Sequence, residues 1–367
     1  MMPDVTRHSV DRSAPPMALS PLGVAAMLCV AVVLAGCAAG TNSTSAATPL
    51  PMVDAALPEY RPMPVRVPND TRYVTESGAI RVGGAEHVRF IVERFDALFS
   101  RTHANIRFDN QAKGTTSAIP LVTYGVILFG PVGRGINPAE ERAYKEAVGG
   151  APIEIRVAHA SNDTSKHLAT SLAVYVNRAN PLERLSEEQV SKILSIGNTS
   201  GDYSRWGQLG LGGVWATRAI HPYGTPEHTG FGDYLQANHL QRRKLAPGSE
   251  QYGDTGAILL RLEQDPAGIA VAAIGRETKS IKAVPIVDRN GHATMGTPAE
   301  IVSNAYPYGR FLYFYLRHVP GQPLDPIVAE YMRMVLSREG QQIIASQANG
   351  YMPLTAEEAR AELAKLN

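Results

Sequence analysis

Short strand-like runs alternate with helix-like segments along most of this chain, and small polar turns join them. In the clearest unit, Ala79–Val82 is typical of a strand and Gly83–Gly84 of a turn. The following segment, Val88–Phe99, has apolar residues every three or four positions, which predicts an amphipathic helix. Such alternation predicts an α/β fold with mostly parallel sheets, in which ligands bind at the C-terminal ends of the strands.

Later segments continue this pattern. Asn137 and the residues after it predict a helix start with proline and acids at its positive end, and Ser186–Gln189 resembles a capping box. Gly197–Gly213 is glycine-rich. Further strands are expected at 106–108, 153–157, 172–176, 216–220 and 268–273, and further helices at 229–240, 255–264 and 326–336. Residues 126–129 form a buried apolar run, and the tail carries the segment 311–316.

The N-terminus is typical of a signal peptide. Arg7 and Arg12 precede the apolar run Leu22–Leu34, which is too short to span a bilayer comfortably. Leu34–Cys37 resembles the bacterial lipobox, which implies removal of residues 1–36 and attachment of lipid to Cys37. Ala38 follows the cysteine, which favours the outer membrane under the bacterial sorting rule.

The mature chain is expected to fold without a disulfide. Cys29 lies in the segment to be removed, and the thiol of Cys37 would carry lipid, so the fold must depend on its core. Residues 38–68 are rich in Ala, Thr, Ser and Pro, and we expect residues 37–74 to form a flexible tether. A net charge of +1 and the absence of a basic block argue against nucleic-acid binding.

Motifs for catalysis are scarce. The sequence has no GxSxG, P-loop or HExxH motif, and its ten histidines show no spacing typical of a zinc site. We therefore expect no enzyme activity, no cofactor and no metal. What remains is a set of three small polar turns, Gly83–Glu86, Gly114–Ser117 and His228–Gly230. Converging on one point, they would form an oxyanion cradle. The alternative is that they are ordinary turns between strands and helices.

The order of these motifs resembles the periplasmic phosphate-binding proteins of ABC transporters, over about Thr75 to Leu366. The resemblance implies a two-lobed type II periplasmic-binding-protein fold with two hinge strands. Residues 75–172 and 283–367 would form lobe 1, and residues 173–282 lobe 2. The features that carry it are the turns at 83–84 and 114–117 with Arg134, then 174–177, Asn180–Pro181, 193–197, Trp206–Gly207, Thr229–Gly230, Gly268–Ile269, 306–313 and 336–341.

The resemblance also implies ligand residues, with departures. Glu86 stands where the family has a Thr, and a carboxylate there would face a like charge. Thr225 stands where the family has the Arg that grips the anion, and Phe231 where it has a Thr. Arg134 could supply charge instead. The implied ligand set is Gly84, Ala85, Thr115, Thr116, Ser117, Arg134, Glu227, Thr229 and Gly230.

Two functions follow from the sequence. The first is a monomeric, lipid-anchored binding protein of the bacterial cell envelope that binds phosphate or a similar oxyanion and delivers it to an ABC permease. The second is a surface lipoprotein that keeps the fold, has lost phosphate binding, and acts through a protein partner or a different ligand.

Overall fold

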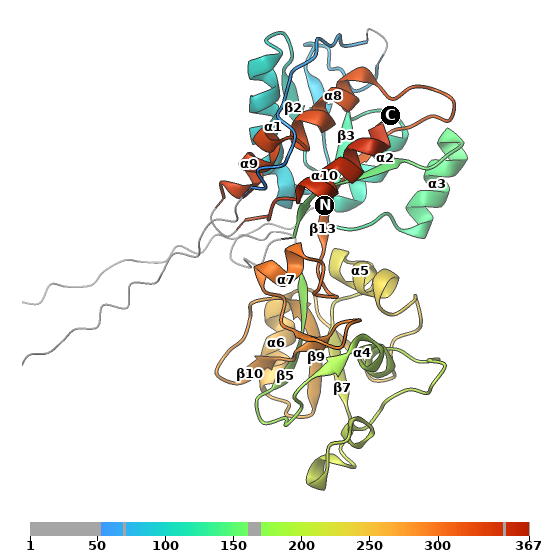
Figure 1. Cartoon of the computed structure of the whole chain (residues 1–367). Helices are drawn as coiled ribbons and strands as arrows, with labels where there is room; N and C mark the ends of the chain where they lie inside the picture. The colour runs from blue at the N-terminus through green and yellow to red at the C-terminus, as the bar shows by residue number, and fades with distance from the viewer. Residues whose placement is uncertain (1–52, 69–70, 161–169, 348–349, 367) are drawn as a thin grey trace, which may run out of the picture. The chain divides into compact units, whose positions relative to one another are not determined.

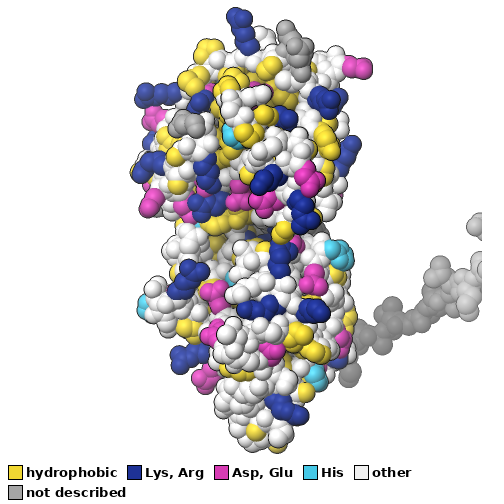
Figure 2. Space-filling model, turned by 90° about the vertical axis from the view of Figure 1, so that its right-hand side faces the viewer, with side chains coloured by type: hydrophobic (Ala, Val, Ile, Leu, Met, Phe, Trp, Pro, Cys, Tyr) yellow, Lys and Arg dark blue, Asp and Glu magenta, His cyan; other side chains and the backbone are white. Residues whose placement is uncertain are grey.

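The computed structural model describes residues 53–68, 71–160, 170–347 and 350–366, which belong to one compact unit. The expected signal peptide, Cys37 and the first part of the tether lie outside the described residues. Within the described ranges, no helix is both long and apolar enough to cross a bilayer. On the face drawn in Figure 2, basic and acidic side chains lie interspersed.

The first lobe contains two small sheets and six α-helices among its described residues. Its largest core packs Phe95, Phe129 and Phe314 together, and α1, α8 and α9 contact one another beside it (Figure 1). The strands are β1 (Ile80–Val82) with β2 (Phe108–Asn110), and β3 (Phe129–Val132), β13 (Phe311–Leu316) and β4 (Ile153–His159); the helices are α1 (Arg89–Thr102), α2 (Thr115–Thr123), α3 (Pro138–Val148), α8 (Pro326–Val335), α9 (Arg338–Ala345) and α10 (Ala356–Leu363).

The second lobe is built on a five-stranded sheet, two of whose inner strands, Leu172–Asn177 and Gly268–Ala273, are buried along their whole length. Helix α6 lies against this sheet (Figure 1). The strand order is β10 (Ile281–Ala283), β5 (Leu172–Asn177), β9 (Gly268–Ala273), β7 (His221–Gly224) and β8 (Glu250–Gln251), and a smaller sheet has the order β12 (Ala293–Thr294), β11 (Ile286–Val287) and β6 (Leu185–Ser186). The helices are α4 (Glu187–Leu194), α5 (Gly230–Asn238), α6 (Thr255–Glu263) and α7 (Pro298–Val302).

Two segments of opposite direction join the lobes. The Ala160 N–H donates to the Arg310 carbonyl over 2.7 Å, and the Leu172 N–H donates to the Tyr308 carbonyl over 3.2 Å. These bonds lie where the chain leaves the first lobe after β4 and where it returns to it before β13. The expectation of two hinge strands matches this arrangement.

The α/β class is confirmed, but the expectation of mostly parallel sheets is wrong. Among the described strands four pairings are parallel and five are antiparallel. The crossing segments explain the difference. Because they run in opposite directions, β13 enters antiparallel between β3 and β4, and β5 lies antiparallel to β9.

The chain returns to the first lobe later than residue 283. Val284, Ile286, Ile301, Tyr306 and Tyr308 all belong to the core of the second lobe. The reason is that β11 pairs with β6, which holds this part of the chain in the second lobe. The return occurs at Gly309–Arg310.

The segment 53–68, expected to be part of the tether, packs on the C-terminal helices of the first lobe. Leu57 is buried against Ala356 and Ala359 of α10. The buried carboxylate of Glu330 in α8 accepts hydrogen bonds from the Tyr60 hydroxyl and the Met63 N–H, both over 2.9 Å. The expected tether therefore does not extend over these residues.

Most local predictions agree with the structure. Asn137 and Ser186 both form capping boxes, and β9 covers the predicted range 268–273. The strand expected at 216–220 is wrong, since residues 216–219 are exposed and the strand begins at His221. The segment that precedes it is a loop with two short 3₁₀ turns, tied together by the Trp206 N–H bond to the Arg218 carbonyl.

Candidate functional site

A cleft of about 830 Å³ lies where residues of the two lobes meet. Its size is in the range of small-molecule sites. The first lobe contributes His87 and Thr115, the crossing segments contribute Thr170 and Arg310, and the second lobe contributes the rest. Those remaining residues are Thr225, Thr229, Gly230, Phe231, Gly253, Asp254, Thr255, Gly256, Leu259, Leu260, Glu263, Ala273, Arg276 and Thr278.

Three helices begin at this cleft. Thr115 starts α2, Gly230 starts α5 and Thr255 starts α6, and all three residues line the cavity. The first N–H groups of a helix have no partner inside it, and the helix dipole is positive at that end. Three such ends at one cleft favour a negatively charged ligand.

The loop before each helix is shaped by local chemistry. The Thr229 hydroxyl accepts from the Gly232 N–H over 3.0 Å and donates to the Pro226 carbonyl over 2.7 Å. The carboxylate of Asp254 caps α6 by accepting from the Ala257 N–H over 2.9 Å. The start of α2 has no side-chain cap, because Gly114 precedes it with a φ of 97°. Thr229 therefore positions the turn, and the unpaired N–H groups of Gly230 and Phe231 are the groups left for a ligand.

Arg310 is the buried cation of the cleft. Its side chain donates to the carbonyls of Thr170 (3.0 Å) and Gly133, and its guanidinium lies 4.9 Å from the ring centres of both Phe231 and Tyr234. Its Nε has no hydrogen-bond partner, and no carboxylate within the described ranges forms a salt bridge with it. Burial lowers the pKa of Arg310, yet an arginine keeps its charge in a protein.

His87 lies at the same cleft in an uncharged state at neutral pH. Burial, and secondly the charge of Arg310, lower the pKa of His87 from 6.5 to about 4. Its Nε2 is buried without a hydrogen-bond partner. The imidazole of His87 therefore offers a hydrogen bond to a ligand in the cleft but adds no charge to it.

The structure brings three of the predicted ligand residues, Thr115, Thr229 and Gly230, to this cleft. The first predicted turn is used internally instead. The Ala85 N–H donates to the Pro131 carbonyl over 2.9 Å, and the Gly84 carbonyl accepts from Lys113 and Gly114, both over 3.0 Å. A Cβ at Gly84 would lie 2.4 Å from the Pro131 oxygen, so only glycine fits there.

Three other predicted ligands lie outside the cleft lining. Thr116 is exposed, and the Ser117 hydroxyl donates to the Gly114 carbonyl over 2.7 Å. The Glu227 carboxylate accepts from the Gln236 amide over 2.6 Å. Glu86, whose charge would oppose an anion, is exposed.

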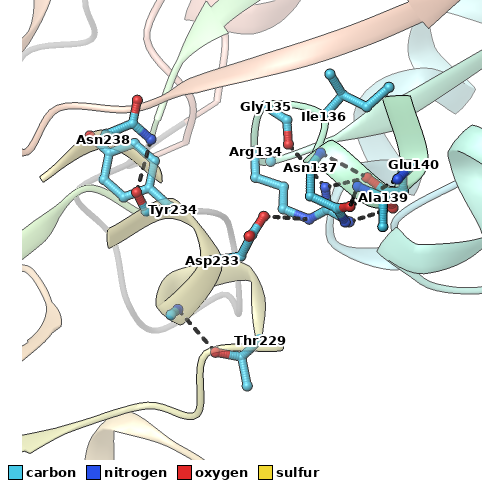
Figure 3. A network of polar contacts seen from close by, with 12 residues as sticks. Arg134, Gly135, Ile136, Asn137, Ala139, Glu140, Thr229, Asp233, Tyr234 and Asn238 are labelled. Carbon is cyan, nitrogen blue, oxygen red and sulfur yellow. Dashed lines mark hydrogen bonds and ion pairs between the residues drawn. The ribbon is translucent and has the colours of Figure 1, made fainter. Parts of the chain in front are cut away.

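Arg134 is also outside the cleft lining, and its guanidinium is already paired with carboxylates. Figure 3 shows it between two carboxylates. It makes two hydrogen bonds to Glu140, over 2.8 and 2.7 Å, and its Nε lies 3.9 Å from Asp233 of α5. Asp233 also pairs with Arg242 over 3.0 Å. The guanidinium expected to supply charge to the ligand thus joins α3 to α5.

Sequence reasoning missed Arg310, His87 and the start of α6. The stretch 306–313 was part of the family resemblance, but an arginine after a tyrosine-rich run carries no motif for ligand binding. The helix at 255–264 was expected, and its N-terminus was the available signal. Within the described ranges, no group of three or more His, Cys, Asp and Glu side chains could hold a metal ion.

Comparisons with known proteins match most of the chain to a protein family. A sequence profile described as a PBP superfamily domain matches residues 70–339. The chain is 28% identical over 333 residues to the phosphate-binding protein PstS of Pseudomonas aeruginosa, which covers 90% of this chain and 95% of that protein. It is 22% identical over 279 residues to PstS of Staphylococcus aureus, covering 75% and 78%.

Solved structures agree on the fold. An ABC-type phosphate transport receptor from Vibrio cholerae superposes with a TM-score of 0.53 at 18% identity, covering 75% of this chain and 99% of that one. PstS from Borrelia burgdorferi gives a TM-score of 0.52 at 16% identity, covering 76% and 99%. At such identities the likeness shows the fold, which is the type II periplasmic-binding-protein fold.

Proposed function

Because the chain belongs to the PBP superfamily, whose profile matches residues 70–339, we propose that it is an extracytoplasmic solute-binding protein for phosphate or a related oxyanion, held in the cleft at Arg310. The PstS relatives, named as phosphate-binding proteins, support this ligand class. The superfamily role also supports a binding protein rather than an enzyme.

The observation that carries the proposal is the uncompensated charge of Arg310. A buried cation without a carboxylate partner is costly, and an anionic ligand would offset that cost. The N-termini of α2 and α5 at the cleft add donors for the same ligand, whereas the start of α6 is capped by the Asp254 carboxylate. Arg310 thereby takes the place of the guanidinium missing at Thr225.

We assign direct contacts to Thr115 and to the backbone of Gly230 and Phe231, with Arg310 supplying charge. The remaining predicted ligands act through the shape of the site. Gly84 and Ala85 hold the first turn against β3, Ser117 holds the start of α2, and Thr229 caps α5. Thr116, Glu227 and Arg134 have no direct role in this assignment.

Thermal unfolding of the full chain tests the ligand class. Phosphate, arsenate, a phosphonate and sulfate are each titrated, with sodium chloride at matched ionic strength as the control. A ligand present at 100 times its Kd adds about 2.7 kcal/mol to the free energy of unfolding. If none of the four anions raises the midpoint above the chloride control, the proposal fails.

The second candidate is a binding protein that has lost its anion and recognises another protein. Thr225 in the cleft and the neutral ring of Phe231 favour it, because neither can grip an oxyanion as a guanidinium does. It predicts a partner in pull-down experiments whose capture survives substitution of Thr115 and Thr229 by alanine. If both variants lose the partner, its capture depends on the residues of the oxyanion cleft, and this result would favour the anion-binding function.

The lipid anchor on Cys37 and an ABC permease as partner complete the proposed role. Leu34–Cys37 supports the anchor, and Ala38 supports the outer membrane. Labelling of cells with a tagged fatty acid should mark the wild-type chain and leave Cys37→Ser unmarked. Size-exclusion chromatography tests the expected monomer.

A further inference from the structure

A second cleft, of about 520 Å³, lies where residues of the two lobes meet around Gly309. It shares no lining residue with the oxyanion cleft, although Gly309 lines this cleft and Arg310, the next residue, lines the other. Tyr234 lies between them. Its hydroxyl donates to the Gly309 carbonyl over 2.7 Å, and its ring lies 4.9 Å from the Arg310 guanidinium.

One wall of this second cleft is aromatic. Phe311 and Tyr313 are alternate residues of β13, and both are partly exposed, with ring centres 6.2 Å apart. The guanidinium of Arg156 lies over the Phe311 ring at 5.0 Å and helps to fix its position. Such a wall offers flat apolar surface to the non-polar face of a ligand.

The part of the lining that the second lobe contributes is rich in hydrogen-bond acceptors. The amide nitrogens of Asn238 and Asn304 are used internally, over 2.8 and 3.0 Å, which leaves their oxygens as acceptors. Asp288 and Asn290 lie on the turn between β11 and β12, where the cleft has a further carboxylate and amide. Acceptors of this kind suit a ligand with several O–H donors.

Both carboxylates that line the second cleft accept hydrogen bonds from within the protein. Glu187 pairs with His239 over 3.1 Å, and Asp288 accepts from the backbone N–H groups of Asn290 and His292, both over 2.8 Å. Arg289 is the one arginine of the lining, against two carboxylates. The lining therefore disfavours an anion, and the phosphate-type ligand of the first cleft does not fit it.

We propose that this second cleft binds a neutral, hydroxyl-rich small molecule of the size of a mono- or disaccharide. The aromatic wall would stack on the C–H face of the sugar ring, and the asparagine and aspartate acceptors would take its hydroxyl protons. The volume lies in the range of ligand sites. This proposal is independent of the oxyanion function.

Calorimetric titration of the full chain tests it, with glucose, galactose, maltose and trehalose as probes and phosphate titrated in parallel. We expect saturable binding of at least one sugar with one site per chain. Tyr313→Ala, which removes the stacking ring, and Asn290→Ala, at an exposed turn that tolerates substitution, should each raise its Kd about tenfold or more. Tyr124→Ala, at an exposed tyrosine outside the cleft, should leave the Kd unchanged.

The proposal is overturned if none of the four sugars gives saturable heat, or if the Tyr313 and Asn290 variants bind the sugar like the wild type. Concentration-dependent self-association that Tyr313→Ala abolishes would overturn it in favour of a protein interface. Phosphate binding should be the same in the Asn290 variant and the wild type. Failure of phosphate to bind therefore bears only on the first cleft.

Discussion

Two buried arginines near the contact between the lobes have opposite surroundings. Arg134 has Glu140 and Asp233 as partners, whereas Arg310 has two carbonyls and two aromatic rings. The first guanidinium is neutralised within the protein and joins two helices. The second retains an uncompensated charge beside a cleft. The same side chain is thus structural in one place and a candidate for ligand binding in the other, and the set of partners makes the difference.

The largest effect should come from breaking the Arg134 pair. Glu140→Gln leaves a buried guanidinium whose nearest remaining carboxylate is Asp233, 3.9 Å away, and we expect the free energy of unfolding to fall by about 3 kcal/mol in urea titrations. Glu93→Gln is the matched control, because its pair with Arg89 is exposed and should contribute at most about 0.5 kcal/mol. Equal effects of the two substitutions would contradict the structural role of Arg134.

The role assigned to Arg310 should be visible in the affinity of the protein for phosphate. Arg310→Met keeps the packing between the two rings and removes the charge, so phosphate binding should weaken by about 1.5–3 kcal/mol. We expect a smaller loss of stability than in Glu140→Gln, and calorimetry with urea unfolding measures both quantities. If Glu140→Gln weakens phosphate binding more than Arg310→Met does, the roles assigned to the two arginines are reversed.

His87 reports on the charge of Arg310. Because the pKa of His87 is about 4 in the folded chain and 6.5 in its ordinary state, the unfolded chain binds the extra proton between these values. Stability should therefore fall as the pH drops from about 6.5 to about 4, and His87→Gln should remove that part of the slope. In Arg310→Met, an NMR titration of the His87 ring should give a higher pKa. An unchanged pKa of His87 would mean that the charge of Arg310 has no influence on this side chain of the cleft.

The smallest effect concerns the cap of α5. Thr229→Ala removes the hydroxyl that accepts from Gly232, and it should cost about 1 kcal/mol of stability. Thr229→Ser keeps the hydroxyl and should be close to the wild type in thermal unfolding. A loss in the serine variant as large as in alanine would show that the methyl group, rather than the cap, matters.

Local signals in the sequence predicted those helices and strands whose formation depends mainly on residues close to them in the chain. The capping boxes at Asn137 and Ser186 and the buried strand Gly268–Ala273 depend on neighbours in the chain, and the structure has them. The strand expected at 216–220 depended on its apolar residues alone. Residues 216–219 are exposed and Ile220 is buried, and the Trp206 N–H bond to the Arg218 carbonyl holds this segment in a loop.

The candidate site was harder to predict because its decisive contacts join distant residues. Arg134 follows a buried strand, which favours it as a ligand, but its pairing with Asp233 of α5 becomes visible only in the folded chain. Arg310 meets Thr170, Gly133 and Phe231, which are far from it in sequence. The start of α5 was predicted at Thr229–Gly230, since a cap and a glycine suffice to mark it.

The packing of residues 53–68 has a practical consequence for work on the purified protein. Glu330 is fully buried under this segment, and Tyr60 and Met63 supply two of its hydrogen bonds. A shortened chain that begins at Thr75 would expose Ala356 and Ala359 of α10, which pack against Leu57, and leave that carboxylate short of donors. Proteolytic trimming should accordingly spare residues 53–68, and an affinity tag should not interrupt them.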